Sequence, residues 1–147
     1  MGDRSARHRD TTSLGDLAEL AVATALVRSG RRLLRPISSA TRYDLVIDND
    51  DGTFTRVQCK MGVLRCGRVE FRTYSVSGHG GESVNYGGQI DAFGVFCRET
   101  GDAYLVPMEA VAHCGAVASL RVAPARNGQS QRVRRALDYV IDPAREP

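Results

Sequence analysis

The sequence contains no tryptophan, and its five tyrosines are scattered along the chain. Proteins that bind single-stranded nucleic acid usually stack the bases on grouped aromatic side chains, and this sequence offers no such platform. It also lacks an apolar run long enough to cross a membrane, and residues 1–10 are too polar for a secretory signal. We therefore expect a protein of the cytoplasm.

Cysteine is sparse and is not spaced for zinc. The four cysteines form no C-x-x-C pair, the spacing that is typical of structural zinc sites. Cys59 and Cys97 lie in apolar runs typical of strands, which favours small buried side chains in a reducing compartment. A zinc site that combines cysteines with His79 or His113 is the alternative.

The charges nearly balance, with a formal net charge of +3. This value permits a polyanionic partner without demonstrating one. The length of 147 residues, with 42% hydrophobic residues, is typical of one soluble domain with a sizeable core.

A helix is expected over residues 13–28. Ser13 can cap its start, the run LAELAVATALV supplies an apolar stripe, and Gly30 is suited to close it. Residues 1–12, with several arginines, are expected to form a flexible basic arm.

The remainder is predicted to be mostly strands. The turn Asn49-Asp50-Asp51-Gly52 should join strands 43–48 and 54–61 into a hairpin. Residues 75–88, rich in glycine and serine, are expected to form a loop. Further extended segments are predicted at 32–35, 68–72, 92–98, 103–106 and 119–122, with a short helix at 108–113 and a helix or irregular basic segment at 130–139. This order predicts an α/β fold with a mixed central sheet flanked by helices. We place one domain at residues 13–125 and a basic C-terminal segment at 126–147.

The hairpin carries an unusual polar cluster. Side chains alternate along a strand, so Gln58 and Lys60 project from the same face. Asp44, at the start of the preceding strand, should lie beside them because a hairpin brings the start of one strand next to the end of the other. Glu19 interrupts the apolar stripe of the first helix and should point toward the sheet.

These groups fit two interpretations. The oxygens of Glu19, Asp44 and Gln58 would suit Mg²⁺ or Mn²⁺, with Lys60 beside the ion. Alternatively, Asp44 and Lys60 form a simple cross-strand ion pair, and Glu19 is a solvated helix residue.

A wider resemblance favours the first interpretation. The helical glutamate followed by D-(x)13-Q-x-K resembles the PD-(D/E)xK nuclease superfamily. The segments GDLAELAVATALVRSG, YDLVIDNDDGTFTRVQCK and QIDAFGVFCRETGDAYLVP resemble small group I intron-encoded homing endonucleases, whose core is like that of Holliday-junction resolvases. The resemblance covers roughly residues 14–111 and implies a restriction-endonuclease-like core.

The resemblance also implies roles for particular residues. Asp44 matches the metal-binding aspartate, Lys60 the lysine and Glu19 the helical acid of several branches. Gln58 stands where the superfamily usually has Asp or Glu, which retains an oxygen ligand but loses a charge, and Tyr43 replaces the motif's proline. The implied catalytic set is therefore Glu19, Asp44, Gln58 and Lys60, and the first three would bind the metal.

The implied activity is Mg²⁺-dependent cleavage of double-stranded or branched DNA in the bacterial cytoplasm. Because two strands require two sites, a homodimer or homotetramer is expected. A junction resolvase and a non-catalytic DNA-binding subunit are the alternatives. Asp91 is expected to fix the local backbone, and catalysis by His79 is disfavoured by its flanking glycines. Further candidates for DNA contact are Ser39, Arg42, Tyr86, Gln89, Arg132, Arg134 and Arg135.

Overall fold

The fold is organised by β3 (Phe54–Arg65), a twelve-residue strand that pairs with three others. The computed structural model describes residues 4–76, 83–124, 127–128 and 133–141, with only the backbone at 4–10, 76 and 83–85. β3 pairs antiparallel with β2 (Leu45–Asp48) and with β4 (Arg68–Arg72), and parallel with β7 (Ala92–Cys97). The sheet is therefore mixed, as the sequence predicted.

The mixed sheet has seven strands. β1 (Arg32–Leu34) pairs with β2, β8 (Asp102–Pro107) with β7, and β9 (Val117–Arg121) with β4. A separate two-stranded sheet joins β5 (Tyr74–Val76) to β6 (Ser83–Asn85). The helical elements are α1 (Arg4–Arg28), α2 (Met108–Val111) and the 3-10 helix η1 (Ala136–Asp138).

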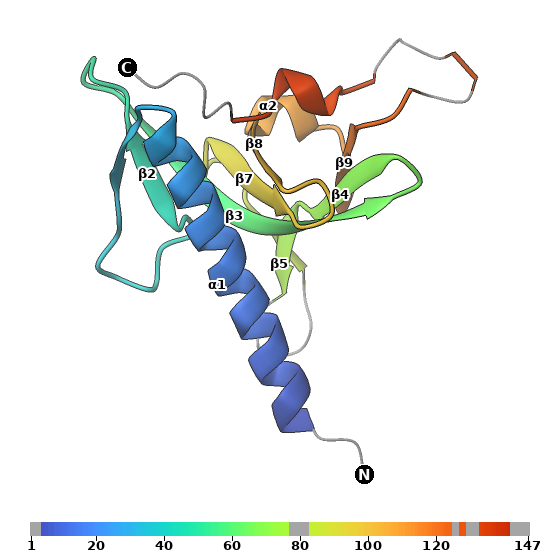
Figure 1. Ribbon diagram of the computed structural model, residues 1–147. Helices are drawn as coiled ribbons and strands as arrows, with labels where there is room; N and C mark the ends of the chain where they lie inside the picture. The colour runs from blue at the N-terminus through green and yellow to red at the C-terminus, as the bar shows by residue number, and fades with distance from the viewer. Residues whose placement is uncertain (1–3, 77–82, 125–126, 129–132, 142–147) are drawn as a thin grey trace.

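The two faces of the sheet are covered by different elements. α1 crosses one face diagonally (Figure 1), where Val22 and Leu26 are fully buried against residues of β2 and β3. The other face packs Phe93 and Val95 of β7 against α2, η1 and the strands β4 and β9. No helix within the described part of the chain is both long and apolar enough to span a membrane.

The hairpin turn forms as predicted. The backbone N–H of Asn49 donates to the Thr53 carbonyl over 3.1 Å. Asp50 and Gly52 have φ values of 60° and 88°, the left-handed region that such turn residues tolerate. Gly30 closes α1 with a φ of 85°, also as predicted.

Three boundaries differ from the sequence prediction. α1 begins at Arg4, so Ser13 lies inside the helix and residues 4–12 are helical rather than an extended arm; those residues contain neither proline nor glycine to stop a helix. β3 runs on past residue 61 to Arg65. The loop predicted at 75–88 contains part of the β5–β6 hairpin. In the region 130–139, where a helix or an irregular basic segment was predicted, the described residues contain the short 3-10 helix η1.

Gly62 explains why β3 continues. A Cβ at this position would lie 2.7 Å from a methyl of Val69 and 2.9 Å from a methyl of Val95. Glycine therefore lets β4 and β7 approach β3 closely, and it does not break the strand here.

Candidate active site

Asp44 directly precedes β2 and is tied to β3 by two hydrogen bonds. Its backbone N–H donates to the Val57 carbonyl over 2.9 Å. The backbone N–H of Cys59 donates to its carboxylate Oδ2 over 2.8 Å. Cys59 lies beyond the last residue pair of β2 and β3, so the carboxylate supplies the acceptor that β2 no longer provides. This arrangement fixes the Asp44 carboxylate at the end of β2.

Glu19 reaches the same region from α1. It precedes the buried residues Val22 and Leu26 by three and seven positions, so its side chain leans toward the sheet. Its side chain is 22% exposed, and it accepts a hydrogen bond from the guanidinium of Arg35. Glu19 is thus only partly exposed, and its carboxylate is engaged by Arg35.

The electrostatics place Glu19, Asp44 and Lys60 in one neighbourhood. Burial raises the pKa of Asp44, and the negative charge of Glu19 raises it further; the Cys59 N–H, Lys60 and Arg35 act in the opposite direction. Burial, again reinforced by Asp44 and Glu19, also raises the pKa of the Cys59 thiol far above its usual value. The negative charge of Glu19 thus opposes ionisation of Asp44, and a bound cation would relieve that opposition.

Lys60 projects from β3 toward the face opposite α1. Its ammonium donates to the hydroxyl of Tyr86 over 2.9 Å and to the carbonyl of Tyr74 over 3.1 Å. Among the ion pairs of the described residues, Lys60 does not pair with Asp44. The simple cross-strand ion pair is therefore not formed, and the Lys60 amine is held by neutral oxygens.

Gln58 lies on the same face of β3 as Lys60 and is half-buried. Its amide donates to the Cys59 carbonyl over 3.4 Å, which leaves the amide oxygen available as a ligand. The oxygens that could hold a cation are therefore those of two carboxylates and one amide. No cluster of three or more His, Cys, Asp or Glu side chains occurs among the described residues; hard oxygen donors completed by water and phosphate match Mg²⁺ better than zinc.

The residues proposed for DNA contact fall in different environments. Arg42 lies with its guanidinium 4.3 Å from the centre of the Tyr86 ring. Ser39 and Gln89 are exposed, and Arg135 is exposed but paired with Asp138 over 2.9 Å. Arg134 donates to the Ser119 carbonyl beside β9. Arg132 and His79 lie outside the described residues.

Tyr86 requires a correction. Its side chain is only 3% exposed and packs edge-on against Phe93, with ring centres 5.7 Å apart. A buried ring cannot contact a DNA backbone, so the predicted contact is wrong. Tyr86 instead holds the ammonium of Lys60.

Asp91 has the structural role that the sequence predicted. Its carboxylate forms a two-pronged pair with the guanidinium of Arg56, with both N–O distances at 3.0 Å, and also accepts the Arg56 backbone N–H. This pair fixes the segment that follows Tyr86 to β3. It therefore supports the position of the tyrosine that binds Lys60.

Arg35 was missed by the sequence analysis. It follows β1, whose antiparallel pairing with β2 ends at Leu34 and Val46. The register of the two strands carries Arg35 toward Asp44 and Glu19. Extending the hairpin argument from β2 to β1 would have identified it.

Comparisons with known proteins bear on the fold and on the family of this chain. A sequence family described as PD-(D/E)XK endonuclease matches residues 9–142. The solved structure of a bacterial homing endonuclease, I-Ssp6803I, is similar with a TM-score of 0.63 and 23% sequence identity, over 88% of this chain and 86% of that one. The search of curated proteins found no significant match. At this identity the structural likeness shows the fold, which is that of an endonuclease core.

Proposed function

Because this chain belongs to the PD-(D/E)XK endonuclease family, we propose that it cleaves DNA internally with the help of a divalent metal ion. The observation that carries the proposal is the electrostatic neighbourhood of Asp44, which joins the carboxylate of Glu19 and the ammonium of Lys60. Opposite charges held near one carboxylate at the end of a strand suit phosphodiester hydrolysis. Nucleases of this family generally use divalent metals, which fits the two carboxylates.

Asp44, Glu19 and the amide oxygen of Gln58 would hold the ion, with Mg²⁺ favoured and Mn²⁺ as a substitute. When bound there, such an ion would supply Lewis-acid chemistry toward the scissile phosphate and an attacking water. Lys60 supplies an ammonium that stabilises the negative charge developing on the phosphate. Tyr86 and the Tyr74 carbonyl fix the direction of that ammonium before substrate arrives.

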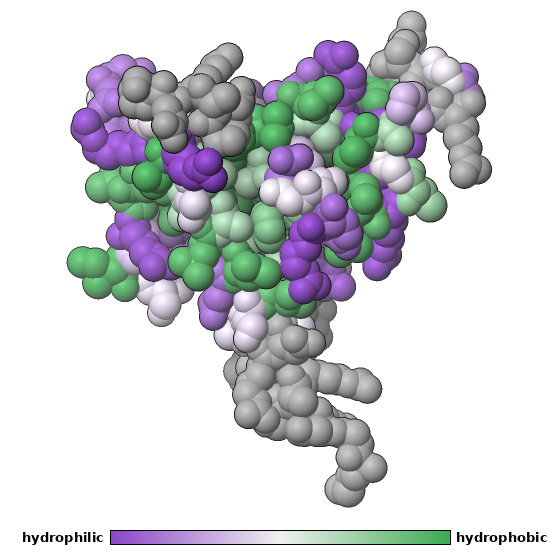
Figure 2. Space-filling model, viewed as in Figure 1, coloured by the Kyte–Doolittle hydropathy of each residue, from purple (hydrophilic) through white to green (hydrophobic). Residues whose placement is uncertain are grey.

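The proposal includes self-association, since each chain has one such site and a duplex has two strands. An apolar stripe on the outer side of α1 supports it. Leu17, Leu20 and Val27 are 39%, 61% and 58% exposed, and the first two line a groove with residues of β7 and β8. Figure 2 views this face and shows hydrophobic residues exposed on it. We expect a homodimer or homotetramer in the bacterial cytoplasm.

A plasmid assay tests the enzymatic proposal. Supercoiled DNA should be nicked or linearised with Mg²⁺ or Mn²⁺ and remain intact with EDTA. Asp44→Ala and Lys60→Ala should each lower the rate at least about a hundredfold while the protein stays folded, because each removes a preorganised charge. Cutting by either variant at the wild-type rate would refute the assigned site.

The same assay separates the alternatives. DNA binding without cleavage in either metal would indicate a non-catalytic DNA-binding subunit. Faster cleavage of a four-way junction than of a matched linear duplex would indicate a resolvase.

A further inference from the structure

The outer face of β3, β4 and β9 carries a concentration of arginines that the active site does not use. On β4, Val69 and Phe71 are buried, so Arg68, Glu70 and Arg72 project to the outside. The strand register places Arg65 of β3 and Arg121 of β9 directly beside Arg68. Side chains at paired positions share one face of the sheet, so these three arginines form a row across three strands.

Such a row is electrostatically unfavourable by itself. Like charges directly opposite on a sheet destabilise it. Glu70 is the acid on this face that the structure pairs with the row, and its carboxylate lies 3.8 Å from Arg68. The Nε of Arg68 is buried and lacks a hydrogen-bond partner among the described residues. Within the same residues, Arg65 and Arg72 belong to no ion pair. The arginines on this face are therefore available to bind an anion.

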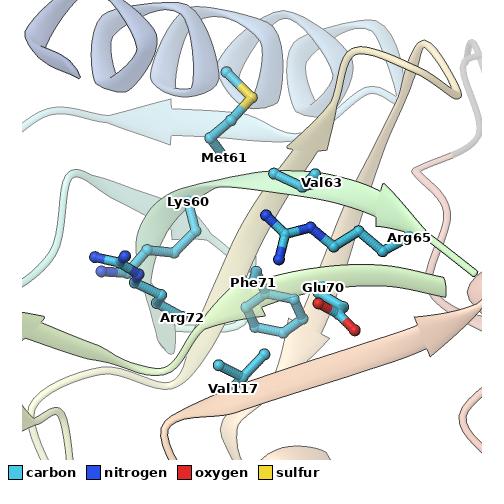
Figure 3. Close-up of a pocket in the computed structure, with 8 residues that line it drawn as sticks. All are labelled: Lys60, Met61, Val63, Arg65, Glu70, Phe71, Arg72 and Val117. Atoms are coloured by element: carbon cyan, nitrogen blue, oxygen red, sulfur yellow. The ribbon is translucent and has the colours of Figure 1, made fainter. Parts of the chain in front are cut away.

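A groove on this face is bordered at one end by Lys60, the lysine of the candidate site. Figure 3 shows Lys60 and Arg72 extending toward one end of the groove, with Arg65 and Glu70 farther along it. Its remaining walls are mainly apolar: Met61, Val63, Phe71 and Val117. Lys60 is thus one of the candidate catalytic residues and also lies at one end of this groove, which we call the basic channel.

The spacing of the arginines on this face suits a polyphosphate chain, with Arg72 lining the groove and Arg68 on the same strand beside it. Arg68 and Arg72 are four residues apart on one strand, which corresponds to about 13 Å. One strand of duplex DNA carries a charge about every 3.4 Å along the helix axis, so this span covers about four phosphates. A small anion would meet only part of the channel.

We propose that the outer face of β3, β4 and β9 binds the phosphate backbone of duplex DNA and leads it to Lys60. The inference rests on the proposed nuclease function, to which it adds the surface that holds the substrate. The arginines at 65, 68, 72 and 121 contact phosphates and carry no sequence preference, because phosphate contacts position a duplex without reading it. Glu70 weakens phosphate binding on this face because its carboxylate pairs with Arg68.

A binding measurement with matched charge changes tests this surface. The variant Arg65→Gln/Arg72→Gln removes two positive charges from the channel, and Arg31→Gln/Arg98→Gln removes two exposed charges elsewhere. Affinity for a fluorescent duplex of arbitrary sequence is measured in EDTA by anisotropy at several salt concentrations. For the channel variant, the slope of log K against log salt should fall in magnitude by about 1.8, with affinity lowered about ten- to a hundredfold at roughly 0.1 M salt. The control pair should change neither substantially.

Glu70→Gln supplies a test of opposite sign. It removes the acid that engages Arg68, so duplex affinity should rise severalfold. Equal losses in the channel and control variants, or an unchanged affinity in Glu70→Gln, would overturn the proposal. If the wild-type protein binds the duplex through this channel but never cuts it, the nuclease function alone is refuted. If the wild-type protein cuts DNA while the channel variant keeps the wild-type salt slope, the channel alone is refuted.

Discussion

The ammonium of Lys60 lies 2.9 Å from the hydroxyl of Tyr86, and this bond joins the active site to the hydrophobic core. Tyr86 is buried against Phe93 of β7, the strand that pairs in parallel with β3. The side chain that we propose stabilises charge is therefore held by a residue that cannot move without disturbing the packing of the sheet. In the proposed site, Tyr86 is a positioning residue and not a catalytic one.

Tyr86→Phe should lower the cleavage rate constant about ten- to a hundredfold with little change in KM. A hydrogen bond to a charged group contributes about 1.5–3 kcal/mol, and about 1.36 kcal/mol corresponds to a factor of ten. The phenyl ring preserves the stacking surface for Arg42 and the contact with Phe93. Tyr104→Phe is the matched control, because Tyr104 is also buried but its hydroxyl bonds to Thr100, far from Lys60 in the sequence. Equal rates for the two variants would argue against positioning by Tyr86.

Asp44→Asn should inactivate the protein and yet stabilise it at neutral pH. The folded-state pKa of Asp44 is raised, chiefly by burial, so the folded chain favours the protonated form relative to the unfolded chain. Ionised Asp44 therefore opposes folding, and its cost appears as pH rises through the window between the unfolded and folded pKa values. Asparagine keeps an acceptor for the Cys59 N–H without the charge.

Thermal unfolding of wild type and Asp44→Asn across roughly pH 3–8 would measure this effect. The difference in Tm should favour the variant at neutral pH, shrink as the pH falls from the folded-state pKa toward the unfolded-state pKa of the aspartate, and be lost below the latter. Asp44→Ala should behave differently, since it leaves a backbone N–H without its acceptor at a cost of about 1–3 kcal/mol. If the Asp44→Asn protein were less stable than wild type at neutral pH, the raised pKa would be contradicted.

Arg35→Gln should lower the Mg²⁺ concentration needed for half-maximal cleavage. The guanidinium of Arg35 pairs with Glu19 and so competes with a metal ion for that carboxylate. We expect a shift of about three- to tenfold, comparable with the loss of one partly exposed ion pair. Arg32→Gln is the control from the same strand region, because Arg32 pairs with Asp48 and Asp50 instead. A higher metal requirement in Arg35→Gln would show that the arginine assists the site.

Gly94→Ala should destabilise the fold and reduce cleavage together. A Cβ at position 94 would lie 2.5 Å from a methyl of Val22, so α1 must shift away from β7. Overpacking of this kind typically costs about 1–3 kcal/mol. The shift also moves Glu19, which lies on the same helix one turn earlier. Gly115→Ala is the control, since nothing lies within 4 Å of a Cβ there.

Val22→Ala offers a rescue of that variant. Removing the valine methyls makes room for the added methyl at position 94, so the double variant should recover part of the lost stability and activity. If the losses in the free energy of unfolding of the two single variants simply add in the double variant, the contact between Val22 and position 94 does not determine where α1 lies.

The hairpin that carries the candidate site was predictable because its determinants are local. The turn residues Asn49 to Gly52 fix where the strands reverse, and alternation then places Gln58 and Lys60 on one face. Asp44 follows from the same register. These contacts depend on residues close together in the sequence, where propensity and period carry most of the information.

The parts that were not predicted depend on distant contacts. Tyr86 meets Lys60 across 26 residues, and the glycine-rich segment between them gave no sign of a buried tyrosine. The predicted strand ended at residue 61, whereas β3 continues through Gly62 because Val69 and Val95 pack closely against that glycine. The row of arginines across β3, β4 and β9 exists only because three strands pair in one register. Ser13 illustrates the converse, since a good capping residue does not start a helix when the preceding residues also favour one.

The segment 133–141 closes two open borders of the sheet. The N–H of Arg121 in β9 donates to the Arg134 carbonyl, and the N–H groups of Leu105 and Ile141 donate to the carbonyls of Tyr139 and Ala103 beside β8. Exposed strand edges are templates for intermolecular pairing. A chain cut before residue 133 would uncover both edges and should aggregate, even though every side chain of the candidate site would still be present. The C-terminal segment thus prevents the strand edges of one molecule from pairing with those of another.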